Sequence, residues 1–162
     1  MQLLIKEYKL MTGYEKINLF KMIYNRLFNE QFQARVYIQK MQRTRWKLKK
    51  FYLRRKLLKK FRICIGMDTV IGEKLSLQHV EVGGDILTGE IGDNCVIYHQ
   101  VTIGNKAGKY PIIGNNVTIY SGARVFGNIH VGNNVVIGTN AVVIHDVPDN
   151  SVVAGVPARI IK

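Results

Sequence analysis

The sequence predicts a mainly β protein built on a left-handed parallel β-helix that follows an α-helical segment. From Ile91 onward an aliphatic residue recurs every six positions in three runs, and glycine often follows it. Residues 1–62, in contrast, show helical spacing and carry the excess of positive charge. The 162 residues are therefore expected to divide into a basic α-helical segment, 1–62, and a β-helix domain, 63–162.

The six-residue period is the strongest signal in the chain. Three such units make one triangular coil, and each unit gives a short strand and a corner, so the aliphatic side chains stack inward. Glycine and asparagine suit the corners because they adopt backbone angles that β-branched residues resist. An amphipathic helix has a period of about 3.6 residues, which six does not match. The aliphatic positions are Ile91, Ile97, Ile103, Ile113, Ile119, Val125, Val131, Ile137 and Val143.

The period slips at two places. Leu77 and Ile91 are 14 residues apart where 12 would keep step, and residues 105–111 add four positions between Ile103 and Ile113. A regular solenoid gains no stability from an interruption, so a functional site is expected where the rule is broken. Tolerated drift of a loop is the alternative explanation.

The first segment predicts helices with apolar stripes. Residues 1–62 hold 18 Lys and Arg against three Glu, whereas residues 63–162 hold 6 against 8 acidic residues. The very basic stretch 43–62 suits contact with an anionic membrane, and a cap that packs its stripe on the first coil is the equal alternative. Nucleic acid is not expected as a partner, because no recognised binding module accompanies the charge. The stripes are Leu19, Phe20, Ile23, Leu27 and Phe28, and then Trp46, Leu53, Leu57 and Phe61.

The remaining composition points to a reduced, metal-free protein. Cys64 and Cys95 form neither a CxxC pair nor a cluster with histidine, so no metal site is predicted. The chain opens without a signal-peptide pattern, and no apolar run reaches the roughly 20 residues that span a bilayer. A cytoplasmic location is expected, with a peripheral position at the inner membrane as an extension of it.

Residues 64–162 resemble serine acetyltransferases and the related capsular or exopolysaccharide O-acetyltransferases, which share hexapeptide repeats. The stretch Ala154-Gly-Val-Pro-Ala-Arg-Ile is the most specific mark, and Ser121-Gly-Ala-Arg-Val-Phe-Gly-Asn-Ile supports it. The resemblance implies an acyltransferase that uses acetyl-CoA as co-substrate and no metal. It also implies a homotrimer, in which acetyl-CoA lies between neighbouring subunits.

The resemblance singles out His79 as the catalytic base. Residues 79–104 align without a gap with the family motif that begins at its catalytic histidine. A hydroxyl attacks a thioester only when a base removes its proton, and an imidazole with a pKa near ~6.5 is suited to that step. His99 is the second candidate, because it faces the same groove in some polysaccharide-modifying relatives. His130 and His145 lie in regular coils and are expected to point outward.

Three departures from the serine acetyltransferase pattern bear on the acceptor. Gln78 and Cys64 stand where those enzymes carry aspartates, and the loop that ends Arg-His-Pro in them ends Lys109-Tyr110-Pro111 here. We therefore expect Lys109 and Tyr110 to bind a sugar hydroxyl of a surface polysaccharide or its lipid-linked precursor, since tyrosine can stack on a pyranose. Serine O-acetylation for cysteine biosynthesis is the alternative, and a non-catalytic β-helix scaffold is the third possibility.

Contacts to acetyl-CoA also follow from the resemblance. Small residues allow close approach, and a guanidinium matches phosphate oxygens. Corner glycines have a competing explanation in turn geometry. The implied cofactor-binding residues are Gly104, Asn105, Gly122, Ala123, Thr139, Arg159 and Lys162.

Overall fold

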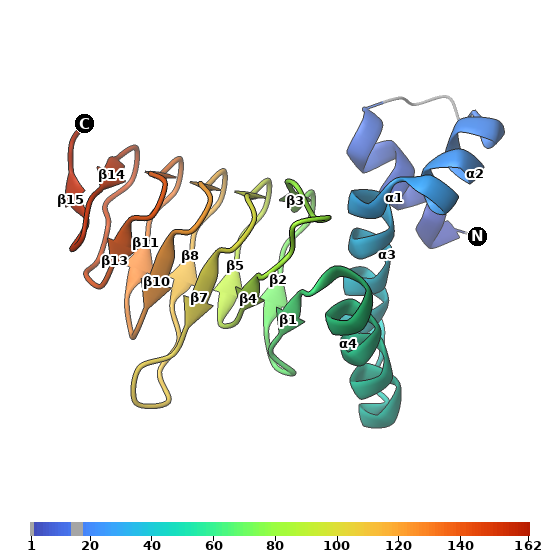
Figure 1. Ribbon diagram of the computed structural model, residues 1–162, viewed down its shortest axis with the longest axis horizontal. Coiled ribbons are helices and arrows are strands. Elements are labelled where there is room, and N and C mark those ends of the chain that lie inside the picture. The colour runs from blue at the N-terminus through green and yellow to red at the C-terminus, as the bar shows by residue number, and fades with distance from the viewer. Residues whose placement is uncertain (1, 14–17) are drawn as a thin grey trace.

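A helical cap lies at one end of a stack of triangular coils (Figure 1). The computed structural model describes residues 2–13 and 18–162. All helices precede the first strand, as the sequence predicts. They are α1 (Gln2–Thr12), α2 (Leu19–Phe28), α3 (Glu30–Arg43) and α4 (Lys47–Phe61).

The coils form a parallel β-helix with three faces, here named sheets A, B and C. Sheet A comprises β1 (Cys64–Ile65), β4 (Ile86–Leu87), β7 (Thr102–Gly104), β10 (Arg124–Phe126) and β13 (Val142–Val143). Sheet B comprises β2 (Val70–Ile71), β5 (Glu90–Ile91), β8 (Ile112–Ile113) and β11 (His130–Val131). Sheet C comprises β3 (Ser76–Leu77), β6 (Val96–Ile97), β9 (Thr118–Ile119), β12 (Val136–Ile137), β14 (Val152–Ala154) and β15 (Arg159–Ile160).

The predicted interior column is confirmed. Each of the nine aliphatic positions is no more than 2% exposed, and each pairs in register with its equivalent one coil away. Ile119, for example, lies between Ile97 and Ile137 in sheet C. Apolar burial of this kind, at roughly 25 cal/mol per Å², is the main force that holds the coils together.

An asparagine ladder runs along the edge between sheets B and C. Asn94, Asn116, Asn134 and Asn150 all have φ between 56° and 59°, and each of the first three side chains donates a hydrogen bond to the next at 2.9–3.1 Å. Asparagine tolerates this left-handed conformation because its short polar side chain can bond locally. The corners therefore contribute polar links between coils as well as turns.

The helical cap shares one hydrophobic core with the coils. Leu53, Leu57 and Phe61 of α4 are buried in the same cluster as Ile65 and the coil interior. Of the two alternatives for the basic stretch, the packed cap is thus confirmed for these three residues. Trp46, the remaining residue of the predicted stripe, is 77% exposed, because it precedes α4 as its N-cap residue.

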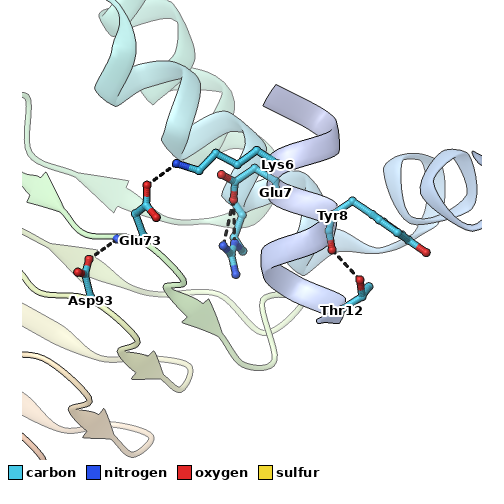
Figure 2. Close-up of polar contacts among 7 residues, drawn as sticks. Lys6, Glu7, Tyr8, Thr12, Glu73 and Asp93 are labelled. Carbon is cyan, nitrogen blue, oxygen red and sulfur yellow. Dashed lines mark hydrogen bonds and ion pairs between the residues drawn. The ribbon is translucent and has the colours of Figure 1, made fainter. Parts of the chain in front are cut away.

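Polar contacts also join the cap to the first coil (Figure 2). Lys6 of α1 pairs with Glu73, whose backbone N–H bonds to the Asp93 carboxylate of the next coil. Inside the cap the Arg35 guanidinium donates to Glu7 Oε2 at 3.0 and 3.2 Å, with both side chains buried. The cap is therefore fixed by charge pairing as well as by apolar packing.

The first predicted stripe, Leu19, Phe20, Ile23, Leu27 and Phe28, lies at the surface. Residues 19–28 do form α2, but Met22 is its buried member, and the stripe of five residues faces outward. No helix in the described part of the chain is long and apolar enough to cross a membrane. Among the same residues, no group of three His, Cys, Asp or Glu side chains is placed to hold a metal ion.

Candidate functional site

The first slip in the period combines one lengthened connection between strands with one shortened connection. Eight residues, 78–85, connect β3 to β4, whereas Thr88 and Gly89 alone connect β4 to β5. We call residues 78–85 the first excursion. Leu87 then returns to the column, in register with Ile65 and Ile103.

The first excursion packs against the end of α4. Gly84 N–H donates to Arg62 O at 3.1 Å, and Cys64 N–H donates to Asp85 O at 2.8 Å. Gly83 has φ +65°, and an added Cβ there would lie 2.7 Å from Phe61 O, so glycine is required for this approach. The cap thereby fixes the loop that carries His79.

The edge between sheets C and A brings the two predicted bases together. Leu77 and Ile97 are register partners, so the residues two positions further, His79 and His99, follow on the same edge. Their rings lie 5.6 Å apart between centroids, at 85°. We call these two residues the histidine pair. His79 is exposed and His99 is half-buried, so the His79 imidazole is the more open of the two to a substrate.

A carboxylate that sequence reasoning missed lies beside the histidine pair. Glu81 Oε1 is 3.3 Å from His79 Nδ1. The pKa of the Glu81 carboxyl is lowered, first by a hydrogen bond from its own backbone N–H and then by His79 and His99. Glu81 lies only two residues after His79 within the irregular stretch, which was the one available signal. It can orient the imidazole although Gln78 and Cys64 cannot.

Two polar atoms remain unpaired close to this edge. In the described part of the chain, His99 Nδ1 and Asp85 Oδ2 are buried and make no hydrogen bond. Asp85 Oδ1 accepts the Val101 N–H at 3.0 Å, and the residue is 1% exposed. Loss of water around the carboxylate raises its pKa to about 6. Asp85 is thus a second carboxyl that the sequence did not single out.

Asp85 is expected to make stability fall as the pH rises. Its pKa is 3.8 ordinarily and about 6 in the folded protein, so between these values the folded state binds more protons than the unfolded chain. The expected loss from pH 4 to pH 7 is about 2.4 kcal/mol, most of the full effect of the shift at about 1.4 kcal/mol per pKa unit. Asp85→Asn keeps an acceptor for Val101 and removes the charge, so its stability should not show this fall. Urea midpoints of both proteins at several pH values test this, and parallel curves would contradict it.

The second slip is a two-residue hairpin that projects from the coils (Figure 1). Lys106 and Lys109 exchange backbone hydrogen bonds at 3.0 and 3.2 Å across Ala107 and Gly108, both with positive φ. Such φ values at both central positions are those of a type I′ turn. We call residues 105–111 the hairpin excursion.

The predicted substrate residues of the hairpin excursion lie at another edge of the prism. Tyr110 and Pro111 line a pocket of about 280 Å³ with Thr88 and Gly89, where sheet A turns into sheet B. Lys109 is exposed at the base of the hairpin. Within one chain these residues and His79 therefore lie on different edges.

The predicted cofactor residues are also divided between edges. Gly122 and Thr139 follow His99 along the edge between sheets C and A, and Gly122 N–H donates to His99 O at 3.1 Å. Ala123 is buried behind them, while Gly104 ends β7 and Asn105 begins the hairpin excursion. Arg159 borders a pocket of about 410 Å³ on the last coil, and Lys162 lies beyond β15.

Both remaining histidines are placed as predicted. His130 and His145 are exposed, in regular coils away from the histidine pair. They therefore serve as natural controls for substitutions at His79 and His99.

Comparison with known proteins relates the chain to serine acetyltransferases, although no family model matches it. A serine acetyltransferase of Staphylococcus xylosus is 39% identical over 128 residues, which are 72% of this chain and 58% of that protein. The serine acetyltransferase of Mycobacterium tuberculosis is 40% identical over 110 residues, 62% of this chain and 47% of its own length. The chain thus spans about half the length of the curated relatives it matches.

Solved structures extend the likeness to the cap. Serine acetyltransferase of Neisseria gonorrhoeae superposes with a TM-score of 0.78 at 26% identity, covering 99% of this chain and 65% of that one. The Brucella abortus enzyme in complex with coenzyme A gives 0.73 at 28% identity, with coverage of 99% and 65%. The resemblance was expected to begin at residue 64, but this coverage includes the four helices.

The repeats, the interrupted coils and these matches define a hexapeptide-repeat acetyltransferase fold. The relatives within that class are serine acetyltransferases, and the chain is serine acetyltransferase-like. The relatives reported above are named as serine acetyltransferases and not as polysaccharide O-acetyltransferases.

Proposed function

We propose that the protein transfers an acetyl group from acetyl-CoA to a hydroxyl, with an imidazole of the histidine pair as general base. The observation that carries this proposal is the side-by-side placement of His79 and His99 with Glu81 at the first excursion. The base takes the hydroxyl proton as the oxygen attacks the thioester carbonyl. The carbon–sulfur bond then breaks, and the imidazolium returns the proton to the CoA thiolate.

Glu81 supports His79 as the proton acceptor in this scheme. When Nδ1–H donates to the Glu81 carboxylate, Nε2 carries the lone pair and is free to meet the hydroxyl. The carboxylate also stabilises the imidazolium that forms, as an acidic partner does in hydrolase triads. His79 is exposed enough to reach a substrate from this position.

A homotrimer would complete the site. Lys109 and Tyr110 lie on a different edge from His79, so they can border the same substrate only if they come from a neighbouring subunit. Acetyl-CoA would lie along that interface, near Gly122 and Thr139 on one side. The complex of the Brucella abortus relative with coenzyme A supports this cosubstrate.

L-Serine is the acceptor that the comparisons support, because the matched relatives are serine acetyltransferases. A sugar hydroxyl is the second candidate, because two acidic positions of the serine acetyltransferase pattern hold uncharged residues here. Cys64 occupies one aspartate position and is contacted by Arg54 at 3.6 Å, and Gln78 occupies the other and donates to Ser76. Neither position therefore offers a carboxylate to the ammonium group of serine.

Thiol release from acetyl-CoA distinguishes the acceptors. The purified protein is offered L-serine and, in parallel, a panel of mono- and oligosaccharides. The His145→Ala variant is assayed with the same acceptors as the matched control. Turnover with L-serine supports serine O-acetylation, and turnover with a saccharide alone supports the second candidate. Absence of turnover with every acceptor, together with no calorimetric binding of CoA, would reject the enzyme in favour of a scaffold.

A further inference from the structure

Helix α4 presents apolar residues on two opposite faces. Leu53 and Leu57 are buried in one cluster with residues of α3 and of the first coil. Leu48 and Phe51 lie on the opposite face by helical spacing and are 85% and 54% exposed, and Tyr52 lies between the two faces and is 56% exposed. Packing within the chain therefore uses only one of the two faces.

A cationic groove adjoins the exposed face of α4. It has a volume of about 860 Å³ and lies where α3 ends and α4 begins. Among the described residues no carboxylate forms an ion pair with its four cations, and Lys40 Nζ lies 6.0 Å from the centre of the Tyr37 ring. The lining includes Lys40, Arg43, Arg45 and Lys49, with Tyr37, Trp46 and Tyr52.

We propose that this surface docks on an anionic phospholipid bilayer. The α4 surface, as we name it, consists of Trp46, Leu48, Phe51 and Tyr52 with the groove cations Lys40, Arg43, Arg45 and Lys49. The cations bind lipid phosphates, while the aromatic and aliphatic side chains enter the headgroup region, where rings with one polar end are favoured. This surface is separate from the histidine pair, so the proposal does not rest on the proposed reaction.

The chemistry of the surface selects a bilayer over other partners. A second copy would bring two sets of unpaired cations face to face, which opposes association. Nucleic acid would satisfy the charge but would leave Leu48 and Phe51 in water. A lipid interface satisfies both, since it offers phosphates and an apolar layer within a few ångströms.

Trp46 is the single tryptophan of the chain, so its fluorescence reports from this surface alone. Vesicles of phosphatidylcholine with phosphatidylglycerol should shift its emission to the blue, and the shift should reverse with added salt. Pure phosphatidylcholine vesicles and inorganic phosphate should leave it unchanged. A blue shift that grows with protein concentration in the absence of lipid would mean that a second copy covers the surface, and the proposal would fail.

Substitutions locate the binding on the α4 surface. Arg43→Gln with Arg45→Gln should weaken partitioning to anionic vesicles by roughly fivefold per charge removed, or roughly 25-fold together. Lys106→Gln with Arg124→Gln removes the same charge from the coils and should leave partitioning unchanged. Leu48→Glu should also weaken it. Equal losses in the two charge variants would show only general attraction of a basic protein and would overturn the assignment.

Discussion

Replacing His79 with alanine should lower kcat/KM for acetyl transfer by about 10³-fold, within the range for a lost general base. The ring of His79 is exposed at the edge between sheets C and A, and Glu81 lies 3.3 Å from its Nδ1. Without the His79 imidazole, the acceptor hydroxyl keeps its proton during its attack on the thioester, and the CoA thiolate leaves unprotonated. Steady-state thiol release with the acceptor found active measures this loss.

The same assay separates the two members of the histidine pair. His99→Ala should lower the rate less than His79→Ala, because His99 is half-buried and lies 5.6 Å away between ring centroids. His145→Ala should leave the rate unchanged, since His145 lies in a regular coil. Loss of activity with His99→Ala while His79→Ala stays active would transfer the role of base to His99.

Replacing Glu7 with alanine should destabilise the protein by about 3–5 kcal/mol, the usual result of removing one partner from a buried ion pair. Arg35 Nε and Nη2 both donate to Glu7 Oε2, and the two side chains are 7% and 1% exposed. The variant leaves a guanidinium buried without its counter-charge. The midpoint of denaturant unfolding, followed by helical circular dichroism, measures the change.

A double variant separates the lost charge from the lost packing. Glu7→Met with Arg35→Met removes both charges and keeps apolar volume between α1 and α3, so its stability should lie near that of the natural protein. If the double variant is as unstable as Glu7→Ala, the pair itself contributes the stability. In that case the explanation through an unpaired charge is wrong.

The coils were predictable because their determinant is local and repeated. Positions such as Ile103 and Ile113 show the interior column without any knowledge of long-range contacts, since each coil places the same side chain against its neighbour. The helical nature of residues 1–62 was predictable for the same reason. The buried face of α4 was also predictable for Leu53, Leu57 and Phe61, whereas that of α2 was not, because its predicted stripe is exposed and Met22 is buried instead.

The site was predictable only in part. His79 and His99 follow from the resemblance, and the register of β3 and β6 brings them together. Glu81 and Asp85 were not predicted, because they lie in an excursion whose path depends on Arg62 and the end of α4. Spacing shows that a loop leaves the coil, but it does not show where its carboxylates come to lie.

The helical cap also determines how the molecule behaves in solution. At β1, β2 and β3 the first coil would otherwise present an open apolar end and unpaired strand edges, which α3 and α4 cover. Exposed strand edges of this kind are templates for other chains to add to. A fragment that begins at residue 63 would therefore tend to associate through its exposed first coil, so the helices protect this end of the stack as well as hold its loop in place.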